Sequence, residues 1–241
     1  MPTQVRISDI GLYLSCPRLV YFDSMGKLQR KNNAQQLLLK NLMLGIVGGI
    51  DLEGELKESL LRLEQELPMV YEIEPEEIGP ACRELEARIP EISASLSPRL
   101  HLLVPSVVEV DLRSEKLGLS GRLDRLAPAC TPSLIRSGKA PEEGVWKRDR
   151  LVLAGYSLLL REMHGKDGAK VDRGLVEYPL SGQVRLVQIY GVDRARVLRI
   201  RERVRQIRDG QLPDRPEGAR CEGCEAKKHC ETRMSLASRF F

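Results

Sequence analysis

Three cysteines near the C-terminal end of the chain have the spacing of metal ligands. Cys221 and Cys224 form a C-x2-C pair within the sequence CEGC, and Cys230 follows after five intervening residues. A fourth cysteine in a compatible setting is Cys16, directly before a proline. Four thiolates are the ligand set of a four-iron, four-sulfur cluster and also of a structural zinc ion. We expect an iron-sulfur cluster that joins the two ends of the chain; zinc, with His229 in place of one cysteine, stays open because both metals accept tetrahedral thiolates.

A short basic stretch in the middle of the chain has the composition of a surface for single-stranded DNA. Lys147, Arg148 and Arg150 follow directly on Trp146. Positive charges attract phosphates, and an indole ring stacks on a base of any sequence. The stretch therefore indicates DNA binding, although the tryptophan would serve equally as a core anchor.

A second basic cluster surrounds the helix predicted over residues 193–209. Seven arginines lie on this helix, and Arg199 and Arg203 are our candidates for DNA contact. The apolar residues recur at helical spacing and would pack on the core: Val197, Ile200, Val204 and Ile207. The alternative is a solvated face in which Glu202 and Asp209 neutralise the arginines.

These side chains must be positioned by a mixed set of elements. The patterns predict helices over residues 9–16, 35–50, 52–67, 78–89, 149–164 and 193–209. They predict strands over residues 104–110, 116–126 and 134–135, and a hairpin of residues 171–179 and 183–191. This order indicates an α/β or α+β domain over residues 1–212, with residues 213–241 as a cysteine-rich cluster-binding appendage.

Composition agrees with a globular protein of the cytoplasm. Hydrophobic residues make up 42% and charged residues 30% of the 241 residues. No apolar run reaches the ~18–20 residues of a membrane helix, and the N-terminus has no signal-peptide pattern. In a reducing compartment the six cysteines are more readily thiols or metal ligands than disulfides; Cys82 and Cys130 lack paired partners and are expected to be free.

The cysteine segments and three internal segments together resemble the CRISPR-associated exonuclease family, the fourth of the core adaptation proteins, whose members are similar to the RecB nuclease domain. The resemblance extends over nearly the whole chain, in the family's order, through ISDIGLYLSCPRLVYF, LGLSGRLDRL, RSGKAPEEGVWKRDRLVLAGYSLLL, LVEYPLSGQVRLVQI and CEGCEAKKHC. It implies a restriction-endonuclease-like core of the PD-(D/E)xK type: a central mixed sheet, flanking helices, and a cluster that joins the N- and C-terminal segments.

Two candidate catalytic residues follow from the resemblance. Active members of the family arrange a histidine, an aspartate, a glutamate-x-lysine pair and a glutamine-x-x-x-tyrosine motif around Mg²⁺ or Mn²⁺. Asp124, in GRLDRL, matches the aspartate and would hold the metal; Tyr156 matches the tyrosine. Asp124 has a structural alternative, a strand-end ion pair with Arg122 or Arg125, and Tyr156 is equally expected as a core residue with a bonded hydroxyl.

The other motif positions depart from the family. Leu134 and Arg136 stand where the glutamate-x-lysine pair is expected, Val152 stands at the glutamine, and Leu44 lies near the place of the histidine. One carboxylate holds a divalent ion poorly, and arginine cannot act as a readily titrating amine.

The departures favour a DNA-binding iron-sulfur protein in which catalysis is weak or lost. One alternative is an active, Mg²⁺- or Mn²⁺-dependent exonuclease for single-stranded DNA, with Glu142, Glu143 or Asp111 as relocated ligands. Another is a protein-interaction scaffold without catalysis. The expected partners are single-stranded DNA and other CRISPR adaptation proteins, and no membrane.

Overall fold

The computed structural model describes residues 4–28, 33–164, 170–219 and 221–231. The helices are α1 (Ile7–Ser15), α2 (Pro17–Ser24), α3 (Ala34–Leu44), α4 (Leu52–Val70), α5 (Pro75–Leu96), α6 (Lys147–His164) and α7 (Gly191–Arg208), with 3-10 helices η1 (Ser97–Leu102) and η2 (Pro179–Ser181). The strands are β1 (Val5–Arg6), β2 (Val107–Ser114), β3 (Leu119–Ala127), β4 (Thr131–Ile135), β5 (Arg173–Tyr178) and β6 (Gln183–Gln188).

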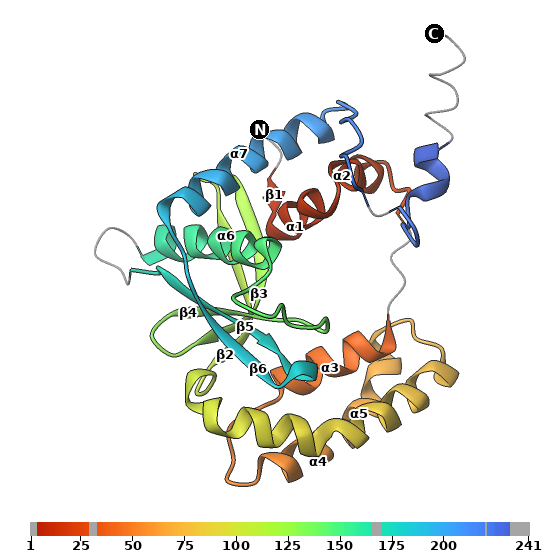
Figure 1. Cartoon of the computed structure of the whole chain (residues 1–241), viewed down its shortest axis with the longest axis vertical. Helices are drawn as coiled ribbons and strands as arrows, with labels where there is room; N and C mark the ends of the chain where they lie inside the picture. Colours follow the sequence, from red (N-terminus) through yellow and green to blue (C-terminus); the bar gives the residue numbers. More distant parts are fainter. Residues whose placement is uncertain (1–3, 29–32, 165–169, 220, 232–241) are drawn as a thin grey trace.

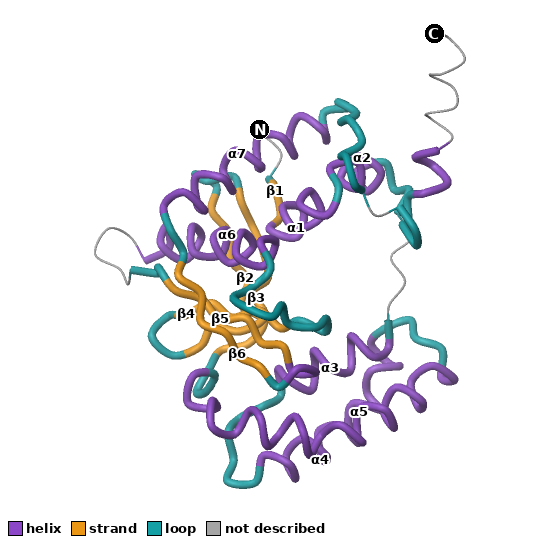
Figure 2. The backbone as a smooth tube through the Cα atoms, viewed as in Figure 1, coloured by secondary structure: helices purple, strands orange, loops and turns teal. Residues whose placement is uncertain are grey.

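The strands form one mixed sheet at the centre of the molecule (Figure 2). Its order is β1-β3-β4-β5-β6, and β2 pairs with β3 as well. The β1–β3 and β4–β5 pairs are parallel, and the β2–β3, β3–β4 and β5–β6 pairs are antiparallel. The predicted central mixed sheet with flanking helices is confirmed.

Helices cover the sheet in two groups with separate hydrophobic cores. Helices α1, α6 and α7 pack on one another, while α3, α4 and α5 form a second packed group; Figure 1 shows the two groups on opposite sides of the strands. The apolar stripe of α7 is buried as predicted and belongs to the first core. Because each helix offers one apolar face, stacking them on the sheet removes that face from water.

The first helix begins earlier than its capping pattern predicted. Helix α1 starts at Ile7, so Ser8 lies inside it, and the capping carboxylate is Asp9. One oxygen of Asp9, Oδ2, accepts from the backbone N of Arg6 at 2.7 Å and from Nη2 of Arg208 at 2.7 Å. Through these two bonds Asp9, which is 1% exposed, joins the start of α1 to the end of α7.

The sequence patterns missed helix α2 and strand β1. Pro17 was interpreted as the end of a helix, yet it is also the first residue of α2, a position where the missing N–H of proline is unimportant. Strand β1 has only two residues, too few to show alternation. Both elements lie where the N-terminal segment joins the first core.

The remaining differences are shifts of element ends. The first two predicted strands, 104–110 and 116–126, are observed as β2 and β3 with the turn at residues 115–118, because β2 continues to Ser114. Helix α3 ends at Leu44, not at residue 50, and α5 extends well beyond residues 78–89 in both directions. The hairpin of β5 and β6 is confirmed, with η2 and Gly182, at a φ of 59°, in the turn.

The C-terminal segment packs on the N-terminal helices. Arg18 of α2 donates from Nε to the carbonyl of Pro213 at 3.0 Å and from Nη1 to Sγ of Cys230 at 3.2 Å. Ala226 is buried in the first core, and the ring of His229 lies 6.3 Å from that of Phe22. Residues 213–219 and 221–231 therefore lie against the same layer as α1 and α2. None of the helices in the described ranges combines the length and the apolar character that crossing a bilayer requires.

Candidate functional site

Asp124 lies near the end of β3, and positively charged groups occupy its two oxygens. Nζ of Lys40 is 2.8 Å from Oδ1. The backbone N of Ile135 donates to Oδ2 at 3.0 Å, and Nη1 of Arg136 lies 3.9 Å from the same oxygen. Residue Asp124 is only 9% exposed, so the two cations neutralise a carboxylate that has little water around it.

Lys40 comes from the largely buried helix α3. The neighbouring side chains are buried in the second core: Leu38, Leu39, Leu42 and Met43. The Lys40 side chain is 42% exposed, so its methylenes pass over the apolar surface and its ammonium reaches the sheet. The predicted partners of Asp124 were wrong: Arg122 pairs with Glu109 at 3.1 Å and Arg125 with Glu177 at 3.1 Å.

Arg136 is held in place by a second carboxylate. Its Nε donates to Oδ1 of Asp149 at 2.6 Å. The hydroxyl of Tyr178 donates to Oδ2 of the same residue at 2.9 Å, and burial together with the Asp149 charge raises the pKa of this hydroxyl. Asp149 and Tyr178, which the sequence analysis did not include as site residues, therefore fix the guanidinium of Arg136.

The positions expected to carry the other metal ligands are apolar and buried. Leu134 and Val152 lie in the first core and Leu44 in the second. Their apolar side chains supply no oxygen or nitrogen to Asp124, so these positions contribute no metal ligand.

A divalent metal ion does not fit beside Asp124 as this site is built. The ammonium of Lys40 occupies the carboxylate. A divalent ion about 4 Å from an ammonium would be repelled by roughly 8 kcal/mol at an effective dielectric constant of about 20, twice the interaction of two unit charges. Metal binding would therefore require Lys40 to leave Asp124.

Tyr156 is a core residue rather than a group directed at a reacting atom. It is 6% exposed, and its hydroxyl donates to the backbone carbonyl of Arg122 at 2.7 Å. Burial, with the nearby charge of Asp124, raises its pKa. The aromatic ring also approaches Gly121, where an added Cβ would lie 3.0 Å from Cε1 of the ring. Tyr156 thus positions α6 on β3.

The acids proposed as relocated ligands lie elsewhere. Glu142 and Glu143 are exposed in the loop after β4, and Glu142 lines a separate cavity. Asp111 is exposed on β2, opposite Arg122. Among the described residues, no three His, Cys, Asp or Glu side chains come together in an arrangement that could hold a metal ion.

A buried ion pair supports the sheet next to the site. Arg125 and Glu177 have no exposed side-chain surface, and Oε1 of Glu177 accepts from Nε of Arg125 and from the hydroxyl of Ser133 at 2.7 Å. Arg125 also donates to the hydroxyl of Ser106 at 2.9 Å and to the carbonyl of Met43. Burial raises the pKa of Glu177, and the Arg125 charge lowers it. The sequence analysis considered Arg125 only as a partner of Asp124 and did not consider Glu177.

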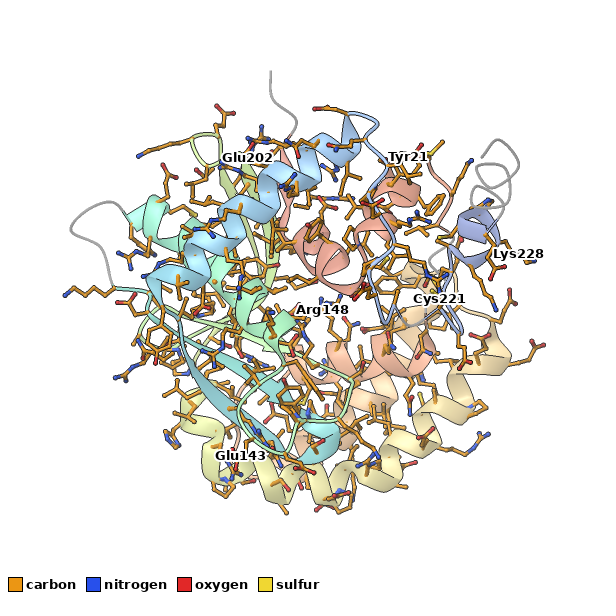
Figure 3. The ribbon with its side chains drawn as sticks, turned by 45° about the horizontal axis from the view of Figure 1, so that its top comes forward. Tyr21, Glu143, Arg148, Glu202, Cys221 and Lys228 are labelled. Carbon is orange, nitrogen blue, oxygen red and sulfur yellow. The ribbon has the colours of Figure 1, made fainter. Side chains whose placement is uncertain are left out.

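The first basic surface is exposed at the start of α6. Lys147 and Arg148 are exposed, and in the described part of the chain neither forms an ion pair with a carboxylate; Figure 3 labels Arg148 near the middle of the view. Arg150 donates to the carbonyl of Gln188 at 3.3 Å. Trp146 is 53% exposed, and its Nε1 donates to the carbonyl of Lys139 at 3.1 Å. The indole is therefore fixed at the surface and is not a core anchor.

The arginines of α7 divide into two groups. Arg194, Arg201, Arg205 and Arg208 are tied to carboxylates, which are Asp172, Glu202, Glu202 and Asp9 respectively. Arg196, Arg199 and Arg203 are exposed and have no carboxylate partner within the described ranges. Glu202, labelled on α7 in Figure 3, is thus the local partner that was expected, but only for part of the set.

The cysteines at the two ends share one region but are not assembled into a metal-binding group in the described structure. Cys16 lies between α1 and α2, and Cys221 and Cys224 flank a turn in which Gly223 has a φ of 70°. Sγ of Cys230 accepts a hydrogen bond from Arg18, two residues after Cys16. The donor set suits an iron-sulfur cluster, and the cluster stays a prediction.

No protein-family model matches the chain. The chain is similar to a protein from Archaeoglobus fulgidus that is described as uncharacterized. The two are 25% identical over 246 residues, which cover 98% of this chain and 99% of that protein. The likeness therefore extends over the sheet and the C-terminal segment alike, and it assigns no activity.

Proposed function

We propose that this chain is a non-hydrolytic, DNA-binding iron-sulfur protein with a restriction-endonuclease-like core, related to the CRISPR-associated exonucleases. The proposal rests on one observation, the contact of Lys40 with Asp124 at 2.8 Å, because the ammonium supplies the positive charge that a metal ion would otherwise bring. The mixed sheet and flanking helices are consistent with such a core. The site keeps the aspartate, and the positions expected to carry the other ligands hold Leu134, Arg136, Val152 and Leu44.

Single-stranded DNA is the proposed partner, on the surface of Lys147, Arg148 and Arg150. Phosphates would contact these side chains, and a base would stack on the exposed face of Trp146. Other CRISPR adaptation proteins are proposed as partners on the resemblance alone. The cluster, when bound to Cys16, Cys221, Cys224 and Cys230, would tie the C-terminal segment to α1 and α2.

DNA binding should weaken steeply as salt rises, and the basic side chains should set the slope. Replacing both Lys147 and Arg148 by glutamine should reduce the slope of log affinity against log salt by about 1.4, because each phosphate contact on a single strand contributes about 0.7. Fluorescence anisotropy with a labelled oligonucleotide measures the slope.

The control for this experiment is Lys57→Gln on α4, which should leave the slope unchanged. Replacing Arg199 and Arg203 together tests whether α7 takes part. If the unmodified protein does not associate with single- or double-stranded oligonucleotides even at low salt, DNA binding is wrong and the scaffold alternative takes its place.

The unmodified protein should not hydrolyse DNA above background with Mg²⁺ or Mn²⁺. A variant with Lys40→Ala, Leu134→Glu and Arg136→Lys should gain Mn²⁺ binding, because it removes the blocking ammonium and restores a second carboxylate. Electron paramagnetic resonance of free Mn²⁺ measures the binding. Recovery of cleavage is expected to need Val152→Gln as well.

The matched control is the variant with Leu134→Glu and Arg136→Lys that keeps Lys40, and it should bind Mn²⁺ more weakly. Robust metal-dependent cleavage by the unmodified protein, abolished by Asp124→Ala, would contradict the proposal and restore the active exonuclease as the better interpretation.

A further inference from the structure

A cavity of about 550 Å³ opens next to the loop that follows β4. In the sequence, this loop comes directly after Arg136. Residues 137–142 of this loop line it, together with η2, the start of β6 and Arg88 of α5. Its size lies within the range of small-molecule sites, about 300–1,000 Å³.

The cavity lies at a favourable place in the sheet for a bound ligand. Strands β4 and β5 are parallel, so their last residues, Ile135 and Tyr178, lie at the same edge of the sheet. The loops that follow both strands line the cavity. In open sheets with parallel strands, ligands bind outside the carboxyl ends of those strands. The position of the cavity does not identify the ligand, but the charges of the side chains that line it indicate its chemical class.

The cations that line the cavity are not matched by carboxylates. Arg88, Lys139 and Arg185 line it, against the single carboxylate of Glu142. Arg185 donates to the backbone carbonyls of Gly144 at 2.6 Å and Glu142 at 3.1 Å, so its guanidinium is fixed by neutral groups and keeps its charge.

The other two cations differ in their partners. Arg88 donates to the carbonyl of Leu180 at 2.6 Å and lies 3.5 Å from Oε2 of the exposed Glu91. Lys139 is exposed, and its ammonium has no ion-pair partner in the portion of the chain that the structure describes. One guanidinium fixed by neutral oxygens, one shared with the exposed Glu91 and one free ammonium give the lining a net positive charge, which suits an anion rather than a cation.

Neutral polar groups line the same space and would orient a ligand. The hydroxyl of Ser181 accepts from the backbone N of Ala140 at 3.2 Å and so ties the loop to η2. Ser137 and Gln183 also line the cavity. A site with several cations, hydroxyls and an amide matches a phosphate ester with a polar organic part.

We propose that this cavity binds a phosphate monoester of nucleotide size, through Arg88, Lys139 and Arg185. The phosphate would come either from a free nucleotide or from the terminal phosphate of a DNA strand. The cavity lining contains none of Asp124, Lys147, Arg148 and Arg150, although it adjoins the Trp146 indole, whose Nε1 donates to the carbonyl of Lys139. Binding of a free nucleotide in the cavity does not depend on the proposed function.

Isothermal titration calorimetry with adenosine 5′-monophosphate, adenosine 5′-diphosphate and adenosine tests the proposal. The two nucleotides should bind, and adenosine should not. Lys139→Gln should weaken nucleotide binding by about five- to tenfold, the loss expected for one partly exposed charge-assisted contact. Because the Lys139 side chain supports no other described group, the variant should fold normally. Arg88→Gln should act in the same direction, and Lys116→Gln, in the β2–β3 turn, should have no effect.

A second arm distinguishes the two sources of phosphate. If Lys139→Gln lowers only the preference for a 5′-phosphorylated over an unphosphorylated oligonucleotide, the ligand is a strand end, and the site is supported. The proposal is overturned if neither ligand responds to Lys139→Gln and Arg88→Gln. It is also overturned if Lys147→Gln alone removes nucleotide binding, since the phosphate then lies on the α6 surface. Loss of all DNA binding with nucleotide binding intact would contradict only the proposed function.

Discussion

Replacing Arg125 by methionine should lower the free energy of unfolding by about 3–5 kcal/mol, the loss expected when one partner of a buried ion pair is removed. The guanidinium joins Glu177, Ser106 and Met43, which belong to three separate parts of the fold. Without it, Glu177 would keep a carboxylate in a region with no water, and its Oε2 already has no hydrogen-bond partner among the described residues. Urea unfolding followed by circular dichroism measures the loss.

The pH dependence of the Arg125 variant distinguishes a buried charge from simple loss of packing. Burial raises the pKa of Glu177, and the Arg125 charge opposes the rise, so the variant should have a still higher folded pKa. The folded state then binds a proton more tightly than the unfolded state. Stability should be retained below the ordinary carboxyl pKa of about 4.3 and should decrease as pH rises through the folded pKa.

The double variant of Arg125→Met and Glu177→Gln is the matched control. It should recover part of the stability and lose the added pH dependence, because no unpaired charge stays buried. A single variant that is destabilised by less than about 1 kcal/mol, or equally at all pH values, would show that the pair does not hold the sheet in the way described.

Protein purified without oxygen should be brown and should contain about four irons and four sulfides per chain. Cys221→Ala should abolish most of the iron and expose residues 213–231 to proteolysis, because cluster binding and folding of this segment are coupled. Visible absorption, iron analysis and limited proteolysis provide the three measurements.

Cys82→Ala is the matched control for the cluster. Cys82 is buried in the second core, where burial raises its pKa to about 11, whereas Cys224 and Cys230 pack against the first core. Loss of the Cys82 thiol should therefore leave iron unchanged. Stoichiometric zinc without iron would rule out the cluster and favour the structural zinc alternative.

The parts of the fold that were predicted correctly depend on local patterns. The apolar stripe of α7, the apolar helix α6 and the β5–β6 hairpin each have a sequence pattern that is complete within a short segment. The structure confirms all three. The start of α1 was wrong because both Ser8 and Asp9 are good capping residues, and only the long-range partner Arg208 favours the arrangement around Asp9.

The site could be predicted only in part, because its decisive contact joins distant segments. Asp124 was identified, but Lys40 lies 84 positions away on a helix that reads as apolar core. Arg136 was identified as a residue that differs from the lysine of the family motif, while its partner Asp149 was predicted only as the start of a helix. Side-chain pairs of this kind become visible when the sheet brings the end of β3 beside α3.

The contacts between the two ends of the chain also determine when the protein can fold. Asp9 is buried beside Arg208, and Arg208 donates to the carbonyl of Gln4 as well. During synthesis the N-terminal residues therefore emerge from the ribosome long before their partners exist, and at about 5–20 residues per second the delay is on the order of ten seconds or more. Until Arg208 and α7 have been made, Asp9 of α1 has no guanidinium partner and the apolar face of α1 is uncovered. The nascent chain would therefore need this segment to be protected from aggregation.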